Sequence, residues 1–170
     1  MIILGIDPGY AIVGYGVIDY RNNHFNVIDY GAILTDAKTP FNERLEIIFD
    51  RLGAIIDEYK PEALSLEKLF YNNNAKTVID VSQARGVIML AAQKQGVRVF
   101  EYTPLQVKQS VVGYGRAEKK QVQEMTRRIL ALEKVPKPDD TADALAMAIC
   151  HAHSSGSLSL AGNIKIRKGI

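Results

Sequence analysis

The chain opens with a short apolar run that a turn ends abruptly. The segment Ile2-Ile3-Leu4-Gly5-Ile6 is followed at once by Asp7-Pro8-Gly9. A run this short, without polar alternation, is typical of a strand that is buried on both faces in the middle of a sheet. Since proline cannot donate to a sheet ladder and glycine tolerates positive φ, Pro8-Gly9 predicts a turn. Asp7 is thus expected at the carboxyl edge of a central strand, where α/β sheets bind ligands, unless it only accepts hydrogen bonds from the turn.

The pattern after this turn predicts two more strands, followed by helices that alternate with strands. The strands are expected at residues 2–6, 12–20, 25–34, 63–67 and 97–102, and the helices at 40–59, 75–95, 104–112, 117–132 and 139–153. Gly14 and Gly16 leave one face of the second strand bare, which predicts close approach by another part of the molecule. Together these elements indicate an α/β fold, a mixed sheet with helices on both faces.

Length and composition favour one globular domain. The chain has 170 residues, of which 47% are hydrophobic and 24% charged, which is ordinary for a single compact domain. We expect this domain to span residues 1–153 and a polar, basic tail at 154–170 to be flexible. No apolar stretch approaches the ~18 residues needed to cross a membrane, and no secretory signal precedes the first strand. Cys150 is expected to be a buried thiol, which favours a cytoplasmic protein.

Charge is distributed unevenly along the chain. Residues 105–137 carry eight Lys and Arg against three Asp and Glu, whereas residues 1–104 carry ten against thirteen. A basic stretch beside an acidic cluster indicates a polyanion held near bound cations. The same pattern also fits a solvated, amphipathic helix face, so charge alone leaves both interpretations open.

Carboxylates recur at the positions where a site would form. Glu67 ends a predicted strand, as Asp7 nearly does, and the last helix opens with Asp139, Asp140 and Asp143. Asp140 and Asp143 are three residues apart and share one helix face, while Asp139 suits a helix N-cap. Acidic residues are also favoured by the dipole at a helix start, which is a purely structural explanation.

The chemistry follows if the two strand ends and the helix start converge. Several carboxylates packed together repel one another and need a counter-charge. Oxygen ligands call for a hard cation, Mg²⁺ or Mn²⁺, whereas Zn²⁺ would prefer His or Cys. Pairs of such ions held by carboxylates catalyse in-line displacement at phosphorus.

Six motifs, in order along the chain, resemble those of one enzyme family. They are G-I-D-P-G at 5–9, S-L-E at 65–67, Q-A-R-G at 83–86, Q-V-K-Q-S-V-V-G at 106–113, A-E-K-K-Q-V-Q at 117–123 and D-x-x-D-A-L-A at 140–146. Together they resemble the bacterial Holliday-junction resolvases, the RuvC family, over essentially residues 1–153. The resemblance implies an RNase H-like fold with a five-stranded mixed sheet. It also implies a homodimer that nicks opposing strands of four-way junction DNA in recombination and repair, together with the RuvA–RuvB branch-migration complex.

The resemblance also implies roles for individual residues. The catalytic, metal-ligating carboxylates would be Asp7, Glu67, Asp140 and Asp143, holding two Mg²⁺ ions per site, with Mn²⁺ as a substitute. The D-A-L-A run selects Asp140 over Asp139, in agreement with the helix-face argument. The DNA-binding residues would be Phe70, which can stack on a base, and Lys108 and Lys119, which can contact phosphates, with Lys120 as an additional basic residue.

Several other residues have a structural interpretation. The helix at 75–95 carries a stripe of small apolar residues that suits packing on another helix, which could be that of a second copy. Gln83 and Arg85, on the same helix, suit packing or dimer contacts. His151 and His153 are expected near the end of the last helix, where a cation suits the dipole.

Two other functions remain as alternatives. The first is a junction-binding protein without catalytic activity, since the presence of carboxylates does not establish catalysis. The second is a phosphate-binding domain of the actin-like or sugar-kinase type, which also opens with an apolar strand and Asp. That class needs a second copy of its phosphate-binding module, for which a single domain leaves no room.

Overall fold

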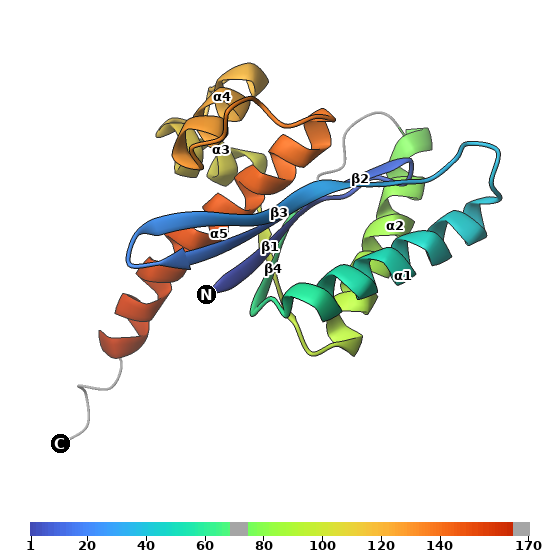
Figure 1. The fold of residues 1–170 in the computed structure, drawn as a ribbon, viewed down its shortest axis with the longest axis horizontal. Coiled ribbons are helices and arrows are strands. Elements are labelled where there is room, and N and C mark those ends of the chain that lie inside the picture. Colours follow the sequence, from blue (N-terminus) through green and yellow to red (C-terminus); the bar gives the residue numbers. More distant parts are fainter. Residues whose placement is uncertain (69–74, 165–170) are drawn as a thin grey trace.

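The computed structural model describes the backbone of residues 1–68 and 75–164 and the side chains of residues 1–68 and 78–155. It contains a five-stranded sheet with the strand order β3-β2-β1-β4-β5 (Figure 1). Strands β1, β2 and β3 form an antiparallel meander, whereas β4 and β5 run parallel to β1. The strands are β1 (Ile2–Asp7), β2 (Ile12–Arg21), β3 (His24–Leu34), β4 (Ala63–Glu67) and β5 (Arg98–Tyr102).

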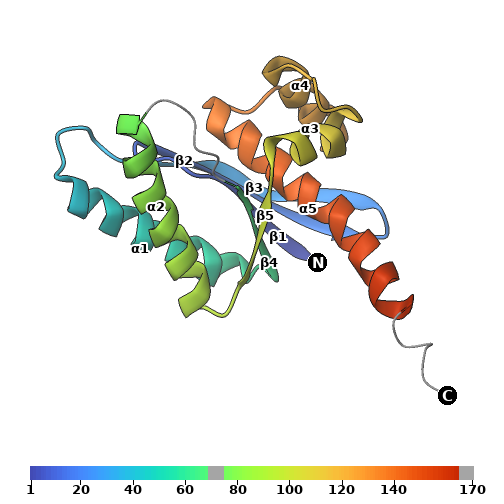
Figure 2. The ribbon, with the colours of Figure 1, turned by 180° about the vertical axis from the view of Figure 1, so that it is seen from behind.

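Helices cover both faces of this mixed sheet. Helices α1 and α2 lie on one side, and α5 crosses the other side, with α3 and α4 beside it (Figures 1 and 2). The helices are α1 (Phe41–Tyr59), α2 (Ala75–Lys94), α3 (Pro104–Val112), α4 (Lys119–Ile129) and α5 (Asp139–Ile164). This is the expected α/β arrangement of an RNase H-like fold. Within the backbone that the structure describes, none of these helices has both the length and the apolar character needed to cross a membrane.

The last helix is longer than the sequence pattern predicted. Helix α5 continues to Ile164, well past the predicted end at His153. Ser154 and Ser155 do not stop the helix because their hydroxyls donate to the carbonyls of Cys150 and Ala152, at 2.8 Å each, within the preceding turn. Serines at these positions are therefore compatible with a continuous helix. The division between a domain and a tail at residue 154 stays a prediction.

The predicted fourth helix begins too early. Ala117 and Glu118 precede α4, and Glu118 adopts the extended conformation of an N-cap. The side chain of Gln121 accepts a hydrogen bond from the Glu118 amide at 2.8 Å, and the Gln121 amide donates to the Glu118 carbonyl at 3.0 Å. These two hydrogen bonds fix the start of the helix at Lys119.

A bare glycine face lets helix α5 lie directly on strands β1 and β2. A Cβ atom on Gly14 would lie 2.0 Å from the carbonyl oxygen of Asp140, and one on Gly5 would lie 2.0 Å from that of Ala144. A Cβ atom on Gly16 would lie 2.5 Å from the side chain of Leu145 in α5. The predicted close approach to the second strand is therefore confirmed, and its partner is the helix that carries the acidic cluster.

The small residues of α2 are buried within this chain. Ala84, Ile88, Ala91 and Ala92 are at most 1% exposed and belong to the core that also holds apolar residues of α1 and the sheet. The interpretation that this part of the stripe faces a second copy is therefore wrong. Among the side chains described for α2, at 78–94, the exposed large apolar residues are Ile79 and Leu90.

The glycine contact can be tested by filling it. Gly14→Ala should lower the free energy of unfolding by at least the roughly 1–3 kcal/mol that core overpacking usually costs, because the new methyl collides with the backbone of α5. Gly86→Ala is the matched control, since Gly86 lies in α2 and a methyl added there would have nothing within 4 Å. That substitution should gain roughly 0.5–1 kcal/mol through helix propensity. Equal changes in the free energy of unfolding for the two variants, measured by urea unfolding, would contradict this contact.

Candidate active site

Two adjacent strands present carboxylates at the same edge of the sheet. Strands β1 and β4 are parallel, and Ile6 is the ladder partner of Leu66. Asp7 and Glu67 follow these two residues and end their strands. The carboxyl ends of parallel strands meet at one edge, so the two strand ends converge, which is the condition of the metal-site argument.

The glycine face brings the third acidic segment to this edge. Gly14 is the ladder partner of Asp7 and also meets the backbone of Asp140 in the first turn of α5. Asp143 lies one turn further along the same helix face. The close packing of the helix on the strand therefore determines where the acidic residues stand relative to Asp7.

A pocket forms where these segments meet. Its cavity of about 210 Å³ is lined by charged residues from several elements and by an apolar wall from α3, α4 and α5. The charged residues are Asp7, Glu67, Lys108, Lys119 and Asp143, and the wall consists of Pro104, Val107, Val122, Ala146 and Met147. Asp140 does not line the cavity itself, but its charge acts on Asp7.

The pKa of Asp7 is strongly raised in this pocket. Burial raises the pKa of Asp7 from its ordinary value of 3.8 to about 7, and the charges of Asp143, Glu67 and Asp140 add to this effect. The pKa of Glu67 is also raised, first by burial and then by Asp143. Such shifts are expected where carboxylates crowd in a partly buried cleft, and they mark the pocket as a candidate site.

A lysine supplies the counter-charge in this pocket. The Lys119 ammonium lies 2.7 Å from a carboxylate oxygen of Asp143. Its positive charge also lowers the pKa of Asp7 and of Glu67, which opposes the effects of burial and repulsion. Lys119 is therefore part of the electrostatic balance among the acids, a role that its place in the sequence does not reveal.

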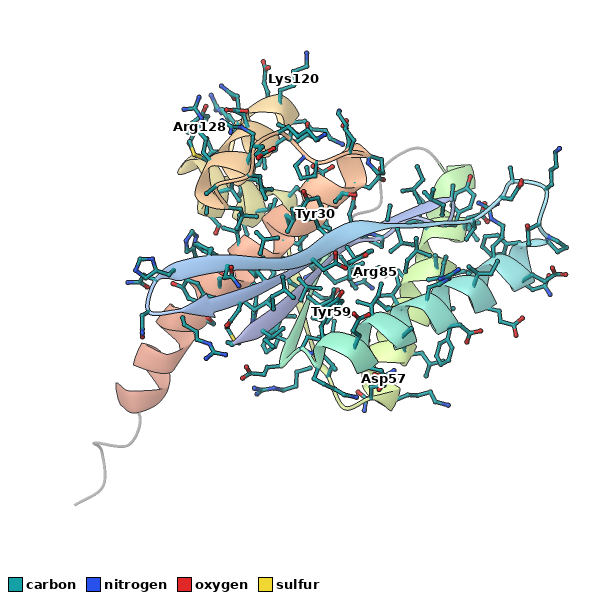
Figure 3. All side chains as sticks on the ribbon, in the orientation of Figure 1. Tyr30, Asp57, Tyr59, Arg85, Lys120 and Arg128 are labelled. Carbon is teal, nitrogen blue, oxygen red and sulfur yellow. The ribbon has the colours of Figure 1, made fainter. Side chains whose placement is uncertain are left out.

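The other predicted DNA-binding residues have different positions. Lys108, on α3, lines the acidic pocket. Lys120 lies on α4 and lines a separate hollow together with Tyr114 and Arg128, and Figure 3 shows Lys120 at the outer end of that helix. Phe70 lies outside the described residues.

Asp139 does not serve as the predicted N-cap. It is the first residue of helix α5, and its carboxylate accepts a hydrogen bond from the ammonium of Lys137. Asp139 is thus held by a neighbour outside the pocket lining. This agrees with the choice of Asp140 as the candidate ligand.

The donor set of the pocket suits a divalent cation. Carboxylate oxygens are the ligands that Mg²⁺ and Mn²⁺ prefer. Among the side chains at 1–68 and 78–155, however, no three His, Cys, Asp or Glu residues stand close enough together to enclose an ion. A lysine ammonium lies against Asp143 in this conformation. The residues present fit a metal by their chemistry, although Asp143 is paired with Lys119.

Comparison with known proteins places the chain in a family. The family model described as crossover junction endodeoxyribonuclease RuvC matches residues 3–151. The chain belongs to the RuvC family. A relative of that name from Ruminiclostridium cellulolyticum is 57% identical over 163 residues, covering 96% of this chain and 98% of the relative. The one from Clostridioides difficile is 59% identical over 155 residues, covering 91% and 92%.

A solved RuvC structure has the same fold as this chain. Thermus thermophilus RuvC in complex with a Holliday junction substrate superposes with a TM-score of 0.87 at 35% identity, covering 91% of this chain and 94% of that one. The yeast mitochondrial resolvase Ydc2 superposes with a TM-score of 0.71 at 12% identity and so supports the fold alone. These matches establish the RNase H-like fold of this RuvC-family chain.

Arg85 is a residue near the site whose contacts could not be read from the sequence. Arg85 is labelled in Figure 3. From α2 its side chain donates to the backbone carbonyl of Glu67 at 3.4 Å and to the carboxylate of Glu101 on β5. It thereby links α2 to the ends of β4 and β5. Its signal in the sequence is the Q-A-R-G motif, which is part of the RuvC resemblance.

The expected role of His151 as a cation at a helix end is wrong. His151 is buried within α5, and its Nδ1 lies 2.7 Å from the hydroxyl of Tyr102. Burial, with a contribution from Arg98, lowers the pKa of His151 to about 4, so the ring is neutral near pH 7. The neighbouring Cys150 is buried as predicted.

The raised pKa of Asp7 predicts a pH-dependent stability. The unfolded chain ionises Asp7 near its ordinary value of 3.8, whereas the folded metal-free chain keeps the proton up to about pH 7. The folded state therefore loses stability as the pH rises between these values. Asp7→Asn removes this cost and should raise the midpoint of thermal unfolding in EDTA at pH 8, but much less at pH 4.5. A variant that is less stable at pH 8 would contradict the electrostatic argument.

Proposed function

We propose that this RuvC-family chain is a structure-specific endonuclease that hydrolyses phosphodiester bonds in four-way DNA junctions, in a reaction that requires Mg²⁺. The observation that carries the proposal is the pocket in which the ends of two strands and the start of α5 bring acids together with Lys108 and Lys119. A site with this combination of charges suits a metal-bound phosphate. The solved RuvC relative in complex with a Holliday junction supports the choice of substrate.

In this proposal each group of residues has a separate task. Asp7, Glu67, Asp140 and Asp143 hold the cations, and Lys108 and Lys119 contact phosphate oxygens. When bound, a pair of Mg²⁺ ions supplies activation of the attacking water and stabilisation of the leaving oxygen. The apolar wall that includes Val107 and Val122 limits the water in the pocket, which strengthens the electrostatic interactions within it.

Symmetric resolution of a junction requires two copies of this site. The described part of the chain contains one acidic pocket of this kind, and paired nicks on opposing strands need two such pockets in fixed relation. We therefore propose a homodimer, which the two-fold symmetry of the substrate and the family resemblance support. The same resemblance supports the RuvA–RuvB complex as a partner and the cytoplasm as the place of action.

A single assay tests the reaction and the substrate together. A synthetic four-way junction and a plain duplex of the same sequence are incubated with the protein in Mg²⁺ or in EDTA. We expect paired nicks in the junction only, and only with the metal. Binding to the junction without cleavage in Mg²⁺ or Mn²⁺ would instead support a junction-binding protein without catalytic activity.

Removal of one carboxylate charge should abolish cleavage without loss of binding. Asp7→Asn preserves the shape of the side chain but removes a candidate ligand, so cleavage should fall by a factor of at least about 100, while junction affinity in EDTA stays near the wild-type value. Asp139→Asn is the matched control and should cleave normally, because its carboxylate is held by Lys137 outside the pocket lining. Retained cleavage by the Asp7 variant would refute the assignment of the site.

The predicted base-stacking role of Phe70 can be separated from structural damage. Phe70→Ala should slow cleavage much more than it weakens junction binding at low salt, because stacking on an unpaired base contributes about 1–3 kcal/mol to positioning, whereas phosphate contacts dominate affinity. Phe70→Tyr serves as the conservative control and should retain most of the activity. Equal losses of binding and cleavage by the alanine variant would indicate damage to the fold.

A further inference from the structure

Lys119 has an unusual place among the charged residues of the pocket. It is the first residue of α4, yet its ammonium reaches across to Asp143 on α5, at 2.7 Å. The lysine side chain is 58% exposed, whereas that of Asp143 is 27% exposed. The contact therefore joins a partly buried candidate ligand to a cation that approaches from the solvent side.

The charge of Lys119 acts on several acids at once. Asp143 has the largest effect on the lysine and raises its pKa, followed by smaller effects of Asp139 and Asp7. In return, the lysine opposes the raised pKa of Asp7 and of Glu67. A single ammonium thus partly neutralises the cluster that a divalent cation would neutralise.

The same contact occupies one of the acids that line the cavity. No three of the described acidic or histidine side chains stand close enough to enclose an ion, although Asp7, Glu67 and Asp143 line one cavity. A carboxylate that points at an ammonium has an oxygen committed to that hydrogen bond. Asp143 can give this oxygen to a metal only after the lysine has moved.

We propose that Lys119 is the resident counter-ion of the metal-free site, which holds Asp143 until a divalent cation displaces it and frees the lysine for a DNA phosphate. This inference rests on the proposed function, because it assumes that the carboxylates bind a metal. It assigns two successive partners to one lysine: the carboxylate before the metal binds, and the phosphate afterwards.

The local structure permits this exchange. The hydrogen bonds between Glu118 and Gln121 hold the start of α4, so only the side chain of Lys119 has to move. That side chain is a flexible four-carbon stem with a compact charge at its end. An ion pair with an exposed partner is weak compared with the coordination of a divalent cation by several carboxylates. The lysine therefore raises the metal concentration that the site requires without blocking it.

Coupling between metal and DNA follows from this exchange. A phosphate that draws Lys119 away from Asp143 leaves the carboxylate available and removes a positive charge from the site. DNA and the metal then strengthen each other's binding, and the effect is reciprocal. Such a site would remain largely free of metal at low metal concentrations until its substrate arrives.

The test measures metal affinity in the absence of DNA. Lys119→Met keeps the length and apolar stem of the side chain but removes its charge. Binding of Mn²⁺ is followed by electron paramagnetic resonance and binding of Mg²⁺ by calorimetry, with circular dichroism to confirm folding. We expect Lys119→Met to bind both ions roughly tenfold more tightly than the wild type, while its junction cleavage falls.

Two further variants identify the cause of any change. Lys119→Arg retains a cation at the same place and should keep the wild-type metal affinity. Lys120→Met removes the neighbouring charge, which lines a separate hollow, and should also leave metal affinity near the wild-type value. An equal gain in metal affinity in the Lys120 variant would show that net charge, and not the position of Lys119, controls metal binding. A gain in metal affinity in the Lys119→Arg variant would show that the cation at position 119 does not compete with the metal.

The outcomes separate this inference from the proposed function. Tighter binding by Lys119→Met alone supports the counter-ion role. Unchanged or weaker metal binding by that variant, while the wild type cleaves junctions in Mg²⁺, overturns the inference and leaves the function intact. If neither protein binds Mn²⁺ at millimolar concentrations, both the inference and the metal assignment are overturned.

Discussion

The contact between helix α5 and the glycine face of the sheet is the constraint on which the site depends. Without a Cβ at Gly5 and Gly14, the backbone of the helix lies directly on strands β1 and β2. Asp7 is the ladder partner of Gly14, so the same contact places the first turn of α5 beside the end of β1. One steric requirement, close approach of two backbones, thus serves both core packing and the position of the acidic residues.

The second constraint is electrostatic. Burial and, after it, repulsion among the acids at this edge raise the pKa of Asp7 and Glu67, so that ionising these groups costs free energy in the folded protein. Lys119 relieves part of this repulsion in the metal-free state by pairing with Asp143. The pocket therefore has the charge arrangement of a metal-dependent phosphodiesterase, but with a protein cation among its carboxylates.

Most of the fold and the carboxylates could be predicted from local patterns in the sequence. The strand ends at Asp7 and Glu67 follow from short apolar runs, and the shared face of Asp140 and Asp143 follows from helical periodicity. Local patterns do not reveal which side chains meet across the fold. The pairing of Lys119 with an acid on another helix depends on tertiary packing and therefore was not predicted.

Two errors have the same physical origin. Serines and histidines are polar in composition, but their effect depends on partners that composition does not specify. The serines after His153 satisfy backbone carbonyls of their own helix, so α5 continues to Ile164. His151 finds the hydroxyl of Tyr102, which is 49 positions away in the sequence, and is neutral because it is buried. The roles of these serines and of His151 follow from the packing of α5, which the sequence does not show.

The order of the segments also has a consequence for synthesis on the ribosome. Strands β1 and β2 are made before the helix that covers their glycine face, which begins only at Asp139. Until that helix emerges, the central strands of the nascent chain expose an apolar surface, and the acidic site does not exist. Completion of the core and acquisition of the site are therefore one event, which waits for α5, and a nascent chain without that helix carries no assembled nuclease site.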